Sequence, residues 1–192
     1  MIKQWSLKSV FESHGYDQIS EGNFHDIFAS WLKFQFNETK IKIIDIGGGN
    51  GRVCLNILPN IDEYLCLDLN YENIKTGSEY FKENKNIKFE LLDVDNEQID
   101  YVCDVVYIDS VLTMLEDPFN VLIKLKKSCD FIFINRVEFK NKTEKLKYLW
   151  GGMTEESTLW NFDELTFKEF CIENNYELLI LTNNSFVLKN NK

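Results

Sequence analysis

The chain has 192 residues, a length that one hydrophobic core can organise, so we expect a single domain. Hydrophobic residues make up 44% of the chain, aromatic residues 14% and charged residues 27%, a composition that excludes an intrinsically disordered protein. The formal net charge of −10 repels a phosphate backbone, which argues against nucleic acid as the partner.

The cysteines predict free, buried thiols rather than a disulfide framework or a metal site. They are odd in number and far apart, and no C-x-x-C pair or nearby His offers ligand spacing. Free thiols indicate that the protein resides in a reducing compartment. Because no apolar run of 18 residues and no signal-peptide pattern occurs, we expect a cytoplasmic protein without a membrane span. The five cysteines are Cys54, Cys66, Cys103, Cys129 and Cys171.

Residues 1–40 are expected to form an N-terminal helical cap. Their apolar residues recur at the spacing of one amphipathic helix. These residues are Phe24, Ile27, Phe28, Trp31, Leu32 and Phe34.

Five short apolar runs predict the strands of an α/β fold. They lack polar alternation, as strands covered on both faces do, and stretches with helical spacing separate them. We therefore expect a three-layer, Rossmann-like, doubly wound sheet of about seven strands, most of them parallel. The runs are residues 42–47, 64–69, 87–94, 103–109 and 130–137.

The remaining residues complete the expected domain after the cofactor-binding half at 41–136. Residues 137–162 form a polar connection longer than a minimal loop, and we interpret it as a substrate loop. Residues 163–192 are expected to form a helix, with Asp163 or Asn161 as its cap, and a terminal hairpin. The hairpin must be antiparallel because its Asn-rich turn is short.

The stretch "IDIGGGNG" is a glycine turn between a strand and a helical segment, where a ligand can approach the backbone. Dinucleotide sites use G-x-G-x-x-G. In the two available registers, Arg52 or Cys54 stands at the third glycine position, so the pattern is incomplete. The pattern that is present is D-x-G-x-G-x-G, formed by Asp45, Gly47, Gly49 and Gly51.

This pattern resembles the first motif of the class I S-adenosylmethionine-dependent methyltransferases, and the likeness covers roughly residues 40–190. It implies S-adenosyl-L-methionine as the cofactor, held by the three glycines, with Asp45 near the methionine amino group. As an alternative, Asp45 could cap the following helix. Gly48 departs from the family, in which many members carry Cys, Ala or Ser, and we expect that position to be optional.

Acidic residues at the expected places extend the resemblance. Asp68 ends the second strand, where a carboxylate can accept both ribose hydroxyls, and Leu69 follows it. The resemblance places Asp93 at the adenine amino group and the Val94 backbone beside the ring, although Asp95 could replace Asp93. After the fourth strand, Asp109 and Ser110 are expected to contact the methionine end or the acceptor, or to cap the next segment. These four residues complete the cofactor site that we predict: Asp93, Val94, Asp109 and Ser110.

The candidates for a general base are His14, His25 and Asp109, since only His titrates near neutral pH unperturbed and Asp109 is expected at the site. Surface or capping roles remain open for both histidines. Arg136 is expected either to bind an anionic substrate group or to pair with Asp109. Trp150 and Trp160 are expected either to line the substrate or to anchor the long loop.

We therefore expect a methyltransferase acting on a small-molecule acceptor, through O- or N-methylation. The chain is also similar to small bacterial methyltransferases found among surface-polysaccharide genes, which implies a sugar or polysaccharide precursor. Three alternatives remain: a nucleotide-dependent oxidoreductase, a non-catalytic binding module of the same fold, and a nucleic-acid methyltransferase. The last is disfavoured by the acidity and by "DSVL" after the fourth strand.

Overall fold

The computed structural model describes residues 26–37, 39–148 and 157–191. The chain divides into two compact units, Met1–Asp93 and Val94–Lys192, which are described in turn.

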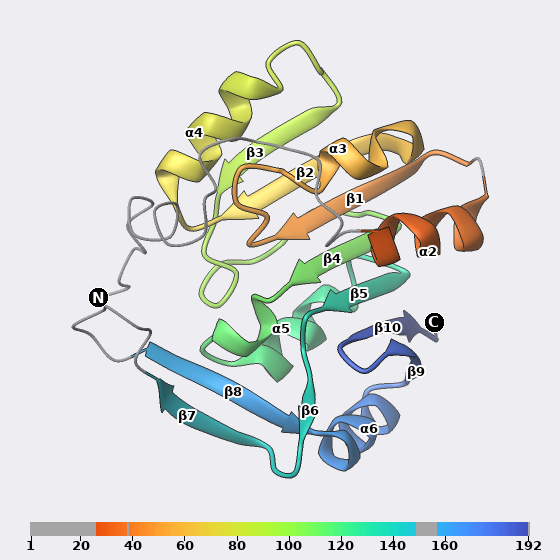
Figure 1. Cartoon of the computed structure of the whole chain (residues 1–192), viewed down its shortest axis with the longest axis vertical. Helices are drawn as coiled ribbons and strands as arrows, with labels where there is room; N and C mark the ends of the chain where they lie inside the picture. The colour runs from red at the N-terminus through yellow and green to blue at the C-terminus, as the bar shows by residue number, and fades with distance from the viewer. Residues whose placement is uncertain (1–25, 38, 149–156, 192) are drawn as a thin grey trace. The chain divides into compact units, whose positions relative to one another are not determined.

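The first unit is a parallel α/β unit with the strand order β3-β2-β1. Figure 1 shows the three strands side by side, and α4 packs against β2 and β3. Its elements are α2 (Asp26–Phe36), β1 (Ile41–Ile46), α3 (Cys54–Ile57), a 3₁₀ turn (Leu58–Asn60), β2 (Ile61–Asp68), α4 (Tyr71–Tyr80) and β3 (Ile87–Leu91).

The helix expected in the N-terminal region is present as α2, and its amphipathic pattern has the predicted effect. Phe28 and Leu32 are fully buried, whereas the Phe34 side chain on the other side of the helix is 85% exposed. The helix contacts α3 of the same unit, and its buried residues lie on one face, as an amphipathic helix requires.

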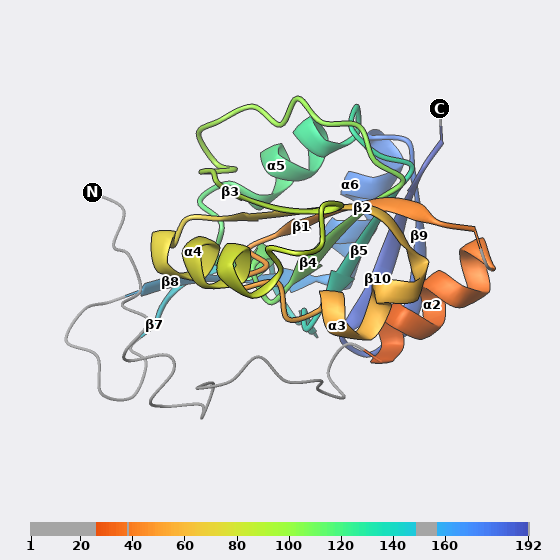
Figure 2. The same ribbon diagram turned by 90° about the horizontal axis from the view of Figure 1, so that it is seen from above.

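The second unit has the strand order β4-β5-β10-β9. Strands β4 and β5 are parallel, while β10 pairs antiparallel with both β5 and β9. Helices α5 and α6 lie on the same face of these strands (Figure 2). The elements are β4 (Val105–Asp109), a 3₁₀ turn (Leu112–Met114), α5 (Pro118–Leu125), β5 (Phe131–Asn135), α6 (Glu164–Glu173), β9 (Tyr176–Thr182) and β10 (Ser185–Asn190).

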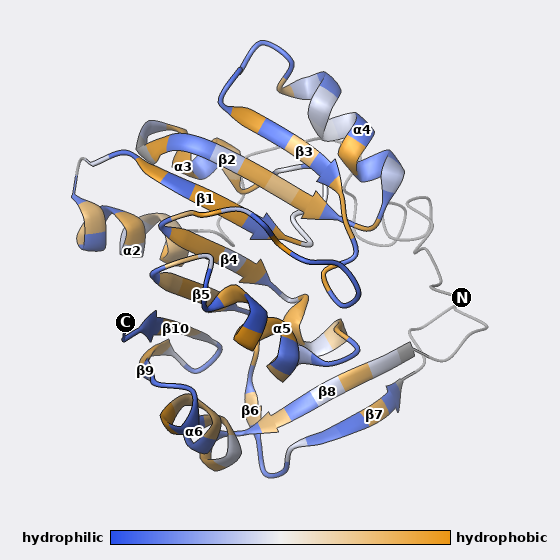
Figure 3. Cartoon of the chain, turned by 180° about the vertical axis from the view of Figure 1, so that it is seen from behind, coloured by the Kyte–Doolittle hydropathy of each residue, from blue (hydrophilic) through white to orange (hydrophobic). Residues whose placement is uncertain are grey.

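The segment 137–162, expected as a loop, contains strands instead. They form a small sheet of order β6-β8-β7, composed of β6 (Phe139–Lys140), β7 (Glu144–Tyr148) and β8 (Ser157–Asp163). The strand β7 is largely hydrophilic, which is why composition suggested a loop (Figure 3). Pairing with β8 gives hydrogen-bond partners to the backbone groups of β7 that face it, and on β8 the rings of Trp160 and Phe162 stack.

The predicted fold class is confirmed: among the described residues the main strand order has seven strands, three in the first unit and four in the second, most of them are parallel, and β9 and β10 form an antiparallel hairpin. Asp163 caps α6 as expected, since its carboxylate accepts a hydrogen bond from the Thr166 N–H at 2.9 Å. The observed strand boundaries differ from the expected ones by up to three residues. For example, β3 ends at Leu91 rather than at residue 94. No helix in the described ranges is long and apolar enough to cross a membrane.

An aromatic cluster forms the centre of the second unit's core. Phe167 of α6 is fully buried and contacts five other phenylalanine rings at centroid distances of 5.1 to 6.0 Å. They are Phe119, Phe139, Phe162, Phe170 and Phe186. The cluster thereby joins α5, α6, β10 and the small sheet.

We expect Phe167→Ala to lower the free energy of unfolding by about 3–5 kcal/mol, because it leaves a cavity among these rings. The matched control is Leu165→Ala on the same helix, where the side chain is 67% exposed and the change should stay within about 0.5 kcal/mol. Urea unfolding of both variants measures the difference, and equal stabilities would contradict this view of the core.

Candidate functional site

The glycine loop of the first unit depends on backbone conformations that favour glycine. Gly47, Gly49 and Gly51 have φ values of +66°, +60° and +78°, in the left-handed region. The Gly47 N–H donates to the Leu67 carbonyl oxygen at 2.7 Å, and the Gly51 N–H donates to that of Gly48 at 3.0 Å. The three alternate glycines named by the motif are therefore the three that the turn requires.

Asp45 lies beneath this loop, within β1, and is only 1% exposed. Its Oδ2 accepts a hydrogen bond from the Tyr64 hydroxyl. Burial raises the pKa of the Tyr64 hydroxyl, and the charge of Asp45 raises it further, so the phenol remains the donor. The alternative of a helix cap is not met, because α3 has Val53 at its N-cap and no side-chain capping bond.

Gly48 is not an optional position in this chain, contrary to the expectation. A Cβ at Gly48 would lie 2.4 Å from Asp45 Oδ2 and 2.8 Å from Cys66 Sγ. Contacts this short force one of these buried groups to move. The loop lies so close to β1 and β2 that the carboxylate of Asp45 takes the space of the missing side chain.

Asp68 connects the glycine loop to the start of α4. Its Oδ2 accepts the Gly49 N–H at 2.9 Å, and its Oδ1 accepts the Asn70 N–H at 2.7 Å. Asn70 caps α4 in turn, accepting hydrogen bonds from the N–H groups of Glu72 and Asn73. Burial raises the pKa of Asp68, against the opposing hydrogen bonds from Asn70, Gly49 and Asn73.

Apolar side chains are exposed next to Asp68. Leu69 is 41% exposed, and Leu91, which pairs with Asp68 across β2 and β3, is 54% exposed. Leu69 was expected in the cofactor site and Leu91 was not, because only the strand register shows which residue lies opposite Asp68. The two residues give the end of β2 an apolar border beside a carboxylate.

Asp93 and Asp95 were the two candidates for the adenine contact, and hydrogen bonds in the second unit favour Asp93. Asp95 accepts the Glu116 and Asp117 N–H groups, at 2.9 and 3.3 Å, ahead of α5. This is a structural role, so Asp93 remains the candidate for the adenine contact. Val94 is buried, and its carbonyl oxygen accepts from Lys124 Nζ.

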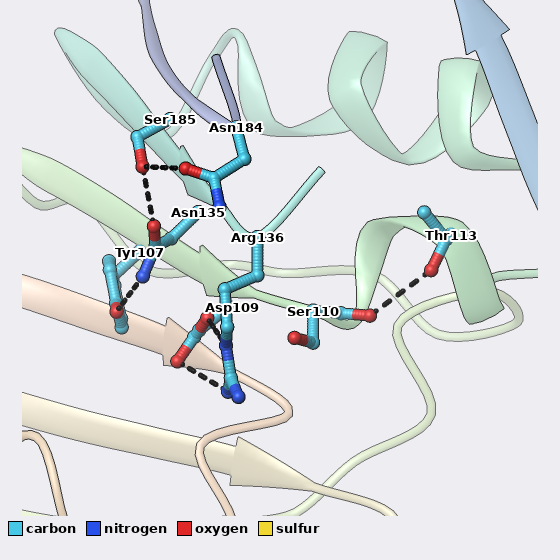
Figure 4. A network of polar contacts seen from close by, with 8 residues as sticks. All are labelled: Tyr107, Asp109, Ser110, Thr113, Asn135, Arg136, Asn184 and Ser185. Carbon is cyan, nitrogen blue, oxygen red and sulfur yellow. Dashed lines mark hydrogen bonds and ion pairs between the residues drawn. The ribbon is translucent and has the colours of Figure 1, made fainter. Parts of the chain in front are cut away.

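In the second unit, Asp109 and Arg136 form a bidentate ion pair (Figure 4). Arg136 Nε lies 2.6 Å from Asp109 Oδ1, and Nη2 lies 2.8 Å from Oδ2. This is the second of the two roles expected for Arg136. Since both carboxylate oxygens accept hydrogen bonds, the geometry favours an orienting role for Asp109 over that of a general base.

A buried polar chain supports the ends of the same strands. The Asn135 amide donates to the Tyr107 hydroxyl oxygen at 3.3 Å and accepts from the Ser185 hydroxyl at 2.6 Å. All three residues are at most 3% exposed. Figure 4 shows that they join β4, β5 and β10 just before Arg136. A satisfied network of this kind holds one backbone arrangement.

Two residues without the freedom of glycine follow these strand ends in left-handed conformations. Ser110 has φ +63° and Arg136 has φ +56°, each costing about 1–2 kcal/mol. An ion pair with a cation side chain that is 42% exposed returns about 0–1 kcal/mol. The Asp109–Arg136 pair therefore does not offset the backbone strain at Ser110 and Arg136. Strained backbone of this kind clusters at functional sites.

Of the remaining candidates, some lie outside the described residues and the others have a structural role. His14, His25 and Trp150 lie outside the described residues. Trp160 anchors its segment, because its Nε1–H donates to the Leu115 carbonyl oxygen at 3.1 Å. All five cysteines are buried and stand outside any disulfide, as expected. Within the described ranges, no group of three His, Cys, Asp or Glu residues is arranged to hold a metal ion.

Residues 44–130 match a family model described as a methyltransferase domain. A curated viral protein, 235L of Invertebrate iridescent virus 6, is 29% identical over 107 residues and carries a provisional description as a methyltransferase. The match covers 55% of this chain and 37% of that protein. The chain thus spans little more than a third of the relative's length.

Several solved structures share the fold at low sequence identity. The sugar N-methyltransferase KedS8 from Streptoalloteichus sp. ATCC 53650 has a TM-score of 0.76 at 8% identity, covering 100% of this chain and 96% of its own. CalS10, an amino pentose methyltransferase from Micromonospora echinaspora solved with bound S-adenosylmethionine, has a TM-score of 0.66 at 7% identity, covering 99% of each chain.

A third match is the 1,6-didemethyltoxoflavin-N1-methyltransferase of Burkholderia thailandensis. Its TM-score is 0.70 at 11% identity, and the alignment covers 95% of this chain and 83% of that one. Likeness at these identities shows a common fold.

We expect Gly48→Ala to lower the free energy of unfolding by about 1–3 kcal/mol, because the new methyl group overlaps the Asp45 carboxylate. Combining it with Asp45→Ala tests the cause, since the double variant should lose less than the sum of the two single losses. Urea unfolding measures all three. Additive losses, or a Gly48→Ala variant as stable as the wild type, would refute the contact.

Proposed function

We propose that this chain, whose residues 44–130 match a methyltransferase domain and which shares its fold with a sugar N-methyltransferase, transfers a methyl group from S-adenosylmethionine to a small-molecule acceptor. The observation that carries the proposal is the carboxylate of Asp68, fixed at the end of β2 by the Gly49 N–H of the glycine loop. A carboxylate in this position can accept ribose hydroxyls.

The residues of the first unit fit this cofactor. The left-handed glycines allow the backbone to approach the methionine end, and Asp68 is the candidate for the ribose. Leu69 and Leu91 supply exposed apolar surface of the kind that an adenine ring covers. The cofactor, when bound, supplies an electrophilic methyl group on a sulfonium. The abundance of acidic residues suits its positive charge.

The oxidoreductase alternative fits the same loop less well. A dinucleotide pyrophosphate binds at the N-terminus of a helix that follows the glycine turn directly. Here, the two turn residues Arg52 and Val53 separate the last glycine from α3, and α3 has only 4 residues, without a side-chain cap. The loop therefore favours a ligand that needs close backbone contact over one that needs a phosphate cradle.

The chain's own part in the reaction consists of binding, orientation and exclusion of water. Methyl transfer depends chiefly on bringing the nucleophile into line with the methyl group, so an elaborate acid–base apparatus is not required. A hydroxyl acceptor needs a base, for which His14 and His25 remain the candidates, whereas a neutral amine needs none. Asp109 is better suited to orienting Arg136.

We propose a sugar or a related polyhydroxylated molecule as the first acceptor class to test. Two structures with this fold, KedS8 and CalS10, act on sugars according to their descriptions. The resemblance to methyltransferases of surface-polysaccharide genes supports the same class. In this proposal the partner is a small molecule rather than nucleic acid, consistent with the net charge of −10.

Binding of S-adenosylhomocysteine should raise the melting temperature, and Asp68→Ala should abolish that rise by removing the ribose acceptor. Asp62→Ala, an exposed carboxylate on the same strand, is the matched control and should retain the full rise. Thermal unfolding with S-adenosylhomocysteine, S-adenosylmethionine and NAD decides between the alternatives. A rise with NAD alone would indicate the oxidoreductase, and no rise with any of them would indicate a module that does not use these cofactors.

The affinity for S-adenosylhomocysteine should fall on acidification at a pH above 3.8, the ordinary value for Asp, because burial raises the pKa of Asp68. The ionised carboxylate accepts the ribose hydroxyls, so protonation removes an acceptor. The linkage to stability has the opposite sign: a raised folded pKa favours folding at low pH, and this contribution is lost as the pH rises through that pKa.

Isothermal titration calorimetry with S-adenosylhomocysteine, repeated from neutral pH down toward the pKa of Asp68, measures the effect on binding. Asp68→Asn should bind more weakly throughout and lose this pH dependence. If the variant kept the wild-type pH profile, the dependence would belong to another group.

A further inference from the structure

The strand β9 is an edge strand with few of the usual protections against pairing. It ends the strand order β4-β5-β10-β9, and among the described residues its strand partner is β10. Because an edge strand presents a row of backbone N–H and C=O groups to any other strand, proteins place charges on it or keep it short. The strand has 7 residues, and its one charged side chain, Glu177, is paired with Lys189 of β10 at 3.1 Å.

Other edge strands of the described residues do carry charges. The strand β3 contains Lys88 and Glu90, and the strand β7 contains Glu144, Lys145 and Lys147. Charged side chains of this kind oppose the pairing of a further strand. The contrast indicates that β9 is the edge on which this chain accepts one.

The middle of β9 is an aliphatic segment in contact with water. Leu178–Leu181 are four consecutive aliphatic residues, of which Ile180 is 48% and Leu181 is 38% exposed, while the other two are half-buried. The start of the strand is fixed, because the buried Tyr176 hydroxyl donates to the Leu122 carbonyl oxygen at 2.8 Å. A rigid strand with an exposed aliphatic edge is suited to pairing with another strand.

We propose that β9 is a dimerisation edge, on which β9 of a second copy of this chain pairs antiparallel, with the two-fold axis at Leu179. Leu179 then lies opposite Leu179 of the other copy, and Leu178 lies opposite Ile180. The axis passes through a residue position because the backbone groups directed to one side of a strand belong to alternate residues. This proposal does not depend on the proposed function.

The charges favour a second copy as the partner and favour this register. The net charge of −10 opposes association between copies, so an interface must keep its carboxylates apart. An axis at Leu179 separates the two Glu177 residues by four positions, about 13 Å along the strands, which exceeds the Debye length of about 8 Å at physiological salt. An axis at Leu178 would separate them by only about 7 Å.

The irregular part of β9 lies at the end of the proposed pairing. Ser185 of β10 pairs with Thr182, and Phe186 pairs with Ile180, so Leu181 is the extra residue of a bulge. With the axis at Leu179, the three central positions 178–180 are regular and all are aliphatic. Each aliphatic side chain of this centre therefore faces an aliphatic side chain of the other copy.

Sedimentation equilibrium of the full-length protein tests the dimer. The mass should rise with concentration from 22.7 kDa toward twice that value. Ile180→Lys places a charge on the edge and should raise the dissociation constant of the dimer about tenfold or more. The matched control is Ile123→Lys on α5, which makes the same change at a side chain that is 45% exposed and should dimerise as the wild type does. Circular dichroism of both variants checks that they are folded.

A disulfide tests the register. In the proposed dimer, two Leu179→Cys residues lie directly opposite each other, with Cα atoms about 4.5–5.5 Å apart, so diamide should oxidise the two thiols to a disulfide and produce a covalent dimer. Thr182→Cys at the end of β9 is the control, because its two copies lie six positions apart and should not be linked. The wild type should stay unlinked, since its five cysteines are buried.

The proposal is overturned if the wild type keeps the mass of one chain at every concentration, or if Ile180→Lys dimerises as tightly as the wild type, which would place the interface elsewhere. Linking by Thr182→Cys without linking by Leu179→Cys would also reject the pairing. Thermal unfolding with S-adenosylhomocysteine is a separate measurement, so a chain that dimerises without binding the cofactor would retain this interface and reject the proposed function alone.

Discussion

The first unit depends on one carboxylate that holds two backbone segments together. Asp68 ends β2 and accepts one N–H from the glycine loop and one from the start of α4. A carboxylate that is partly removed from water must be compensated by such donors, so the loop and the helix are fixed as a consequence of its burial. Because the same carboxylate is the residue that we propose for the ribose, a substitution there changes the loop as well as the proposed binding site.

In the second unit, neutral polar side chains hold the ends of the strands together. Behind the strand ends, the Asn135 side chain bonds Tyr107 on one side and Ser185 on the other, and all three side chains are neutral. The charged pair of Asp109 and Arg136 stands in front of this chain, at a partly exposed position. Neutral polar groups thus provide rigidity where desolvation is complete, and ions are kept where water still reaches one partner.

The sequence predicted most of the fold because its signals were local. Apolar runs marked the strands, the spacing of Phe28 and Leu32 marked α2, and the alternate glycines marked the turn. The small sheet was missed since β7 is polar and is held by pairing with β8, which is a non-local effect. Leu91 was missed for the same reason, and so was the restriction on Gly48, which arises from the close approach of Asp45. Motifs locate a loop, but only packing shows which of its positions tolerate a side chain.

The cysteines beneath the glycine loop have a practical consequence. Cys66 Sγ donates to the Gly49 carbonyl oxygen at 3.4 Å, and Cys54 follows the loop in α3. Burial raises the pKa of both thiols, so neither reacts as a thiolate while it stays buried. The rate at which an alkylating reagent modifies these thiols is therefore set by how often this region opens, so that rate measures local unfolding at the glycine loop.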